Sequence, residues 1–256
     1  MLIKLISFSL ICLCAAAALL VKLGGGVDAG AAAGLTDFVE WDLSNWAPAL
    51  DFWLQTSSLD LSNVYALEIG AGLGGLTLWL ALKGARVVCT DLRGPAPGAR
   101  ELHRRHGVEH LISYRALDAT AIPYVEKFDL VIFKSVLGDV GRGGRRESQE
   151  RAVREMHKAL RPGGELWFAE NLEGSALHRL ARRLIPRGTL WRYVSLEEAG
   201  QFLSPFRRRH LRTTGFLGVF GREGLPRDLL GALDRAVFNR VVPERWRYVV
   251  FGTAQK

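Results

Sequence analysis

The sequence predicts an α/β fold built on a doubly wound, largely parallel sheet. Three observations predict it. Short apolar runs alternate with helical patterns between residues 64 and 170, a glycine-rich loop follows the first run, and acidic residues follow the next two. Such alternation is typical of parallel strands joined by helices that cover both faces of a sheet. With 256 residues, of which 48% are hydrophobic, the chain is long enough for one large core.

The N-terminal 35 residues are expected to lie outside this core. Residues 5–21 carry no charge and are bounded by Lys4 and Lys22, so residues 1–23 are predicted to form a hydrophobic helix. Because no clear small-residue cleavage site follows, we expect an uncleaved anchor with the folded domain on the cytoplasmic side of a membrane. A cleaved signal, or an extension from a misassigned start codon on a cytoplasmic protein, is the alternative. Residues 24–35, rich in Gly and Ala, are predicted to be a linker.

The folded domain is predicted over residues 36–256. Residues 36–55 carry aromatic side chains at helical spacing, and Pro48 excludes a single long helix. These aromatics indicate a packing surface or, alternatively, a lid over a ligand. The repeating part then predicts strands at 64–69, 86–90, 111–116, 128–134 and 165–170, with helices at 73–83, 99–106 and 147–160 and a turn at 161–164.

The last third of the chain departs from this alternation. A basic helix is predicted at 175–184, and the capping box from Ser195 to Glu198 opens a second helix. Two further strands are predicted at 209–220 and 246–254. Between them lies a helical insert at about 222–243, whose helix is expected at 226–238.

The glycine-rich loop after the first strand fits two kinds of cofactor. One reading takes Gly75 as the third glycine of the dinucleotide pattern G-x-G-x-x-G, and Asp91 lies where a ribose-binding acid belongs. The other reading is a G-x-G-x-G loop that ends at Gly74. Glu68 favours the second reading, because a carboxylate next to the loop would repel a pyrophosphate and attract a cationic amino-acid ligand. S-adenosylmethionine (SAM) is such a ligand.

Acidic residues at the ends of neighbouring strands support a nucleoside ligand. Asp91 ends the second predicted strand, and Asp118 follows the third. Because ligands of open parallel sheets bind beyond the carboxyl ends of the strands, both acids are expected near the glycine loop. A carboxylate accepts two hydrogen bonds side by side, which suits the ribose hydroxyls for Asp91, and Asp118 is placed to bind the adenine amino group.

These motifs together resemble the class I SAM-dependent methyltransferases, from about residue 59 to the C-terminus. The resemblance rests on the segments 67–74 (LEIGAGLG), 90–92 (TDL), 117–119 (LDA), 128–131 (FDLV) and 160–166 (LRPGGEL). It implies a Rossmann-like sheet of seven strands with the last strand antiparallel, and SAM as cofactor. The cofactor-binding residues that it indicates are Glu68, Gly70, Ala71, Gly72, Gly74, Asp91, Leu92, Asp118, Ala119 and Lys134. The helical insert and the apolar N-terminus depart from the pattern.

The catalytic residues are less clearly indicated. Methyl transfer from a sulfonium is an in-line displacement that depends mainly on orientation, and it needs a base only if the acceptor must lose a proton. Lys134 and Asp139 are the candidates, because the segment after the fourth strand faces the methyl group in this family. His103, His106 and His110 have helical spacing, but without a nearby acid cluster they indicate a solvated helix face, and no metal site is predicted.

The expected function is methyl transfer from SAM to a small-molecule or lipid acceptor. An NAD(P)-dependent oxidoreductase and a non-catalytic SAM-binding protein are the alternatives. The net charge of +8, with clustered arginines, suits a membrane surface or an anionic substrate. No nucleic-acid partner is expected, because no basic motif interleaved with aromatics is present. The sequence does not indicate the oligomeric state.

Overall fold

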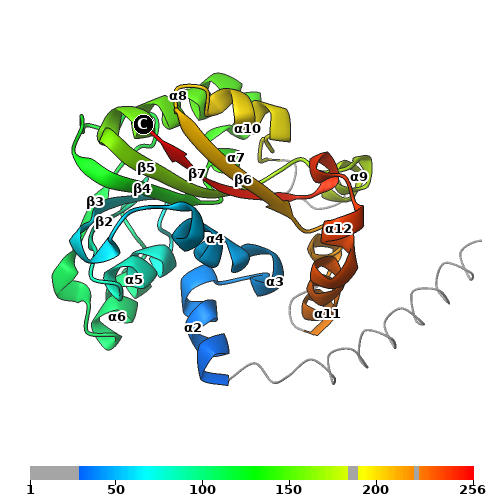
Figure 1. Ribbon diagram of the computed structural model, residues 1–256, viewed down its shortest axis with the longest axis horizontal. Helices are drawn as coiled ribbons and strands as arrows, with labels where there is room; N and C mark the ends of the chain where they lie inside the picture. The colour runs from blue at the N-terminus through cyan, green and yellow to red at the C-terminus, as the bar shows by residue number, and fades with distance from the viewer. Residues whose placement is uncertain (1–28, 184–189, 222–224) are drawn as a thin grey trace, which may run out of the picture.

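A computed structural model describes residues 29–183, 190–221 and 225–256. In this part of the chain seven strands form one sheet, in the order β3-β2-β1-β4-β5-β7-β6 (Figure 1). The strands are β1 (Tyr65–Ile69), β2 (Arg86–Asp91), β3 (Ile112–Ala116), β4 (Phe128–Lys134), β5 (Leu160–Asn171), β6 (Arg208–Thr214) and β7 (Val249–Gln255). Strands β1 to β5 pair in parallel, and β7 runs antiparallel between β5 and β6. The predicted seven-stranded Rossmann-like sheet with an antiparallel last strand is therefore confirmed.

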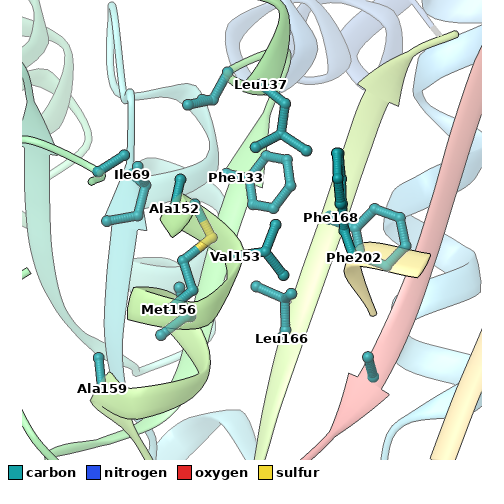
Figure 2. Packing of buried hydrophobic residues seen from close by; sticks show 14 of the residues in the cluster. Ile69, Phe133, Leu137, Ala152, Val153, Met156, Ala159, Leu166, Phe168 and Phe202 are labelled. Atoms are coloured by element: carbon teal, nitrogen blue, oxygen red, sulfur yellow. The ribbon is translucent and has the colours of Figure 1, made fainter. Parts of the chain in front are cut away.

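Helices cover both faces of the sheet (Figure 1). One face carries α4 (Pro48–Thr56) and α5 (Gly75–Ala81), with α6 (Pro97–Arg105) packed beside α5. The other face carries α8 (Arg146–Ala159) and α10 (Leu196–Phe202), which pack on Phe133, Leu166 and Phe168 (Figure 2). The capping box predicted for the start of α10 is present.

The central strand β4 shows how the sequence produces these two layers. Its side chains alternate, so that Leu130 and Ile132 belong to the core on the α5 side, whereas Val131 and Phe133 belong to the core on the α8 side. All four side chains are buried. A strand covered on both faces therefore reads as a continuous apolar run, which is how it was recognised in the sequence.

Strands β5 and β6 differ most from the prediction, and β7 begins at Val249 rather than at residue 246. Strand β5 begins at Leu160, so the predicted turn at 161–164 lies within it as a bulge: the pairing with β4 jumps from Phe128 opposite Leu160 to Leu130 opposite Glu165. Strand β6 ends at Thr214 rather than near residue 220. Gly215 follows with a φ of 80°, and a short helical turn, η4 (Gly218–Phe220), takes the chain away from the sheet.

The structure describes only the last part of the two predicted N-terminal segments, the hydrophobic helix and the linker. Residues 1–23 and residues 24–28 lie outside the described residues. Helix α2 (Ala29–Val39) occupies the remainder of the range 24–35, so this half of the predicted linker is helical. Its alanines explain the difference, because alanine has the highest helix propensity. None of the helices in the described ranges is both long enough and apolar enough to cross a bilayer.

The aromatic segment forms three helices, α2, α3 (Leu43–Trp46) and α4, and Pro48 occupies the first turn of α4 as the predicted break. Trp53 stacks on Trp167 of β5 with ring centroids 6.0 Å apart, so it belongs to the core. The insert folds as α11 (Leu225–Leu233), the π-helical turn η5 (Asp234–Phe238) and α12 (Asn239–Val241). It is helical as predicted, apart from residues 222–224, which lie outside the described residues.

Candidate active site

The glycine loop that follows β1 has the backbone that its sequence demands. Gly70, Gly72 and Gly74 have φ angles of 67°, 54° and 77°, a region that residues with a side chain rarely adopt. Space is also limited. A Cβ on Gly70 would lie 2.5 Å from Cγ2 of Val136, and one on Gly74 would lie 2.7 Å from the ring of His103. Gly74 is also the N-cap of α5, so the loop ends at a helix N-terminus.

Gly75 has a different reason to be glycine. It lies inside the first turn of α5 without a positive φ, but a Cβ there would be 2.6 Å from the backbone oxygen of Asp37 and 2.5 Å from that of Phe38. The end of α2 thus lies directly against α5. The fourth glycine of the motif, which completes the dinucleotide pattern, is explained by this helix contact without a pyrophosphate.

Asp91 joins the end of β2 to the glycine loop. Its Oδ2 accepts a hydrogen bond of 3.0 Å from the N–H of Gly72, and its Oδ1 accepts one of 2.7 Å from the N–H of Leu92. The backbone of Ala71 is held to the same strand, because its N–H donates to the carbonyl of Thr90 at 2.8 Å. The carboxylate predicted to bind ribose is therefore positioned beside the loop.

A cleft of about 430 Å³ opens at the carboxyl ends of β1, β2 and β4. Its walls include six residues predicted from the sequence: Gly70, Asp91, Leu92, Asp118, Ala119 and Asp139. Its volume is in the range of small-molecule sites. Three carboxylates line it against one arginine, Arg145. This acidic lining suits a cationic ligand and opposes a pyrophosphate.

Asp118 lies in the loop after β3 and forms a tight turn. Its Oδ1 accepts hydrogen bonds of 2.8 Å from both the N–H and the hydroxyl of Thr120. The next residue, Ala119, is buried in the wall of the cleft. Asp118 itself is exposed.

Glu68 has a role different from the one that the sequence argument relied on. It does not line the cleft. It is buried, and its Oε2 accepts hydrogen bonds from the N–H of Thr77, at 2.9 Å, and from the Thr77 hydroxyl. Burial raises the pKa of Glu68 to about 8. With this pKa the Glu68 carboxyl group is mostly protonated at neutral pH, so it repels a pyrophosphate only weakly. The preference for a cationic ligand therefore depends on the acids that line the cleft.

Lys134, at the end of β4, binds the N-terminal helices. Its Nζ donates a 2.9 Å hydrogen bond to the carbonyl of Val39, the last residue of α2, and lies 3.2 Å from the ring centroid of Trp41. Burial lowers the pKa of Lys134 to about 8, against the opposing attraction of Glu40, Glu68 and Glu170. The ammonium group thus fastens the α2–α3 junction to the sheet.

The sequence reasoning missed three polar residues around the segment after β4. Ser135 lines the cleft with a φ of 59°, and its hydroxyl accepts a 2.7 Å hydrogen bond from Nδ2 of Asn171. The buried Glu170 accepts hydrogen bonds from the N–H groups of Val136 and Leu137, at 2.9 and 2.6 Å. Burial raises the pKa of Glu170 to about 7. Ser135, Glu170 and Asn171 come together only because β4 and β5 are neighbouring strands. No local sequence motif contains all three residues.

His103 corrects the prediction of a solvated histidine face. It is fully buried, with Nε2–H donating to the carbonyl of Gly74 at 2.9 Å and Nδ1 accepting from the hydroxyl of Tyr114 at 2.8 Å. The histidine therefore holds the loop carbonyl against β3. Helical spacing could not separate a face that packs on a loop from one that faces water. Among the described residues no group of three or more potential metal ligands occurs.

Comparison with known proteins relates this chain to methyltransferases. A family model described as a methyltransferase domain matches residues 67–168. The chain is 31% identical to methyltransferase GfsG of Streptomyces halstedii over 46% of this chain and 42% of that protein. It is 30% identical to a ubiquinone biosynthesis O-methyltransferase of Xanthomonas oryzae pv. oryzae over 52% of this chain and 57% of that enzyme.

A solved structure extends the fold comparison across most of the chain. Phosphoethanolamine N-methyltransferase 2 of Haemonchus contortus, in complex with SAM, matches 88% of this chain and 57% of its own with a TM-score of 0.60 and 16% identity. The family model and these relatives support the class I SAM-dependent methyltransferases as the family of this chain. As in a methyltransferase sheet, and unlike the all-parallel 3-2-1-4-5-6 order of dinucleotide-binding domains, β7 is inserted antiparallel between β5 and β6. The chain spans about half the length of the curated relatives that it matches.

Proposed function

We propose that this protein transfers a methyl group from SAM to a small-molecule acceptor. The acidic cleft at the carboxyl ends of β1, β2 and β4 carries the proposal. SAM carries a sulfonium and an ammonium group and no phosphate, so the three carboxylates of the cleft attract it. The small-molecule character of the acceptor is supported by relatives such as the ubiquinone biosynthesis O-methyltransferase.

The cofactor-binding residues follow the walls of the cleft. Asp91 binds the ribose hydroxyls, because its carboxylate is held beside the loop at the end of β2 and each oxygen can accept a hydrogen bond besides the one from the backbone. Asp118 and Ala119 hold the adenine, with Leu92 packing on the base. The loop from Gly70 through Ala71 and Gly72 to Gly74 lies next to the amino-acid part. Glu68 and Lys134 act indirectly, by holding α5 and α2 around this loop.

The methyl group is transferred by positioning more than by acid–base chemistry. SAM supplies the methyl group and a neutral thioether as leaving group, so the chain's task is to align the acceptor in line with that bond. Asp139 is the candidate for accepting a proton from the acceptor, because its side chain lines the cleft. Lys134 is less suited to that task, since its ammonium group is already bound to Val39.

Three finer expectations remain part of the proposal. A lipid acceptor is one form of small-molecule substrate, and the segment 1–23 would attach the enzyme to the cytoplasmic side of a membrane. In this proposal the chain consists of an anchor at residues 1–23, a linker that ends before α2, and a catalytic domain that extends to residue 256. The apolar composition of residues 5–21 supports it.

Calorimetric titration separates SAM from the nicotinamide cofactors. We expect SAM and S-adenosylhomocysteine to bind the full chain, and NAD and NADP to give no heat of binding. Asp91→Asn should weaken SAM binding at least about tenfold, because hydrogen bonds to a charged group contribute about 1.5–3 kcal/mol. The matched control is Asp51→Asn, on the exposed side of α4. Binding of NAD alone would refute the proposal.

Turnover distinguishes an enzyme from a SAM-binding protein without activity. The full chain is incubated with methyl-labelled SAM and an extract of small molecules from the host, and labelled products are identified by mass spectrometry. A product that depends on the intact chain and is reduced in Asp91→Asn supports the enzyme. SAM binding without any labelled product would favour the non-catalytic alternative.

A further inference from the structure

Helix α9 (Ala176–Arg183) is oriented opposite to an ordinary surface helix. Its buried residues are His178 and Arg182, whereas Leu177 and Leu180 are 52% and 57% exposed. Surface helices of soluble domains normally turn their apolar side toward the core. A helix that hides its polar side and presents leucines to the outside indicates an apolar partner for those leucines.

The buried polar side of α9 holds this orientation in place. His178 donates from Nε2 to the carbonyl of Phe216 at 2.9 Å, and its Nδ1 accepts from the hydroxyl of Ser175 at 2.8 Å. Arg182 donates to the carbonyls of Leu172 and Glu173, both at 2.8 Å. Rotating the helix to bury its leucines would break these bonds and leave buried polar groups without partners, at about 1–3 kcal/mol for each group.

The exposed leucines continue into a larger apolar surface. Leu177 and Trp246 line the same hollow of about 810 Å³. We call this surface the α9 face. It comprises exposed apolar residues on α9, η4, η5, α12 and the turn η6 (Glu244–Trp246), namely Leu177, Leu180, Val219, Phe220, Val237, Val241 and Trp246. Figure 1 shows α9, α11 and α12 gathered at one end of the molecule.

Basic residues accompany these apolar side chains. The exposed charged residues of α9, η5, α12 and η6 are five arginines and one acid: Arg179, Arg183, Arg235, Arg240, Arg245 and Glu244. The hollow is lined by Arg179 and Arg245 and by two acids, Glu173 and Glu197, of which Glu173 lies 3.8 Å from Arg179. The α9 face is thus apolar and positively charged at once.

We propose that the α9 face binds the surface of an anionic lipid bilayer. Leucine and valine side chains enter the boundary between headgroups and acyl chains, tryptophan is favoured at that level, and arginines attract anionic headgroups. A second copy of the chain fits less well, because pairing two α9 faces would bring their arginines together. The proposal concerns a surface outside the cofactor cleft, and it does not depend on the methyl-transfer activity.

The position of the face in the fold gives it a consequence for access. β5 ends at Asn171 just before α9, and β7 begins at Val249 just after η6, opposite Asn171. The α9 face therefore lies at the carboxyl edge of the parallel strands, the same edge as the cofactor cleft. A bilayer bound there would lie at the edge at which the cleft opens.

Hydrogen exchange of the full chain with vesicles tests the proposal. The vesicles contain phosphatidylcholine with or without about one third phosphatidylglycerol. We expect the peptides that cover 176–183 and 244–248 to exchange more slowly with the anionic vesicles, and those of α6 to be unchanged. This local readout is needed because residues 1–23, predicted to be a membrane anchor, would bind vesicles without protecting α9. Unchanged exchange in α9 would overturn the proposal.

Matched variants separate the α9 face from general hydrophobicity. The double variant Leu177→Gln with Leu180→Gln should raise the lipid concentration that gives half-maximal protection at 244–248 at least about tenfold. Each leucine side chain that is buried in the bilayer stabilises the bound state, and glutamine removes this stabilisation. Leu82→Gln with Val125→Gln removes two exposed apolar side chains near the amino ends of β2 and β4 and should have no effect. Equal losses in both variants, or protection of α9 that rises with protein concentration in the absence of vesicles, would refute a lipid partner.

Discussion

Replacing Gly75 by alanine tests whether α2 is packed on the cofactor-loop helix as the structure shows. The added Cβ would lie 2.5 Å from the carbonyl oxygen and 2.9 Å from the carbonyl carbon of Phe38, and 2.6 Å from the oxygen of Asp37. All three atoms belong to the backbone, so no side chain can rotate away. To restore an ordinary contact of 3.4 Å, the end of α2 must move by roughly 0.9 Å.

Two effects of opposite sign determine the magnitude. Overpacking of this kind costs about 1–3 kcal/mol, while alanine at a helical position gains up to about 1 kcal/mol over glycine. We therefore expect Gly75→Ala to lower the free energy of unfolding by about 1–2 kcal/mol. The matched control is Gly200→Ala within α10, where a Cβ meets nothing within 4 Å, and it should raise stability by about 0.5–1 kcal/mol.

Urea unfolding followed by tryptophan fluorescence measures both variants against the wild type. Because the displaced helix α2 lies against the first turn after the glycine loop, SAM affinity should fall in Gly75→Ala and stay constant in Gly200→Ala. If Gly75→Ala were as stable as the wild type or more stable, the close contact between α2 and α5 would be wrong. The packing explanation of the fourth glycine would then fail with it.

Two further substitutions probe the buried charges. Burial raises the pKa of Glu68 from its usual 4.5 to about 8, so the folded protein binds a proton that the unfolded chain has released. The contribution of Glu68 to the free energy of unfolding should therefore fall by on the order of 3 kcal/mol as the pH rises from 5 to 8. Glu68→Gln should remove this part of the pH dependence in thermal unfolding. Lys134→Met removes the bond to Val39 and should cost about 1–2 kcal/mol and speed proteolysis near residues 39–42.

Each of these substitutions has its own control. Lys83→Met removes a lysine whose Nζ lies 5.4 Å from the ring centroid of Trp79 at the surface, and it should leave proteolysis near α2 unchanged. For Glu68→Gln, the comparison is with Glu147→Gln in the first turn of α8. A variant at Glu68 that keeps the full wild-type slope between pH 5 and 8 would show that another group titrates there.

The strand pattern and the cofactor motifs could be predicted because they depend on neighbours in the sequence. The sequence predicts β4 over the residues that it occupies, since a strand buried on both faces is apolar throughout. Gly70, Asp91 and Asp118 follow strand ends, and the order of a parallel sheet brings such ends together. The turn at 161–164 was recognised for its glycines, but its role as a bulge in β5 depends on the pairing with β4.

The sequence by itself determined the fold class and the meeting of Gly70, Asp91 and Asp118 at one edge of the sheet, because hydrophobic periodicity and glycine positions are local properties of the chain. Only the tertiary structure decided what Glu68, Gly75 and His103 contact: Thr77, the end of α2, and the loop carbonyl of Gly74. It also decided which side of α9 is buried. These outcomes depend on partners far away in the sequence, and a buried polar side chain is specified by the donors and acceptors that the rest of the fold brings to it.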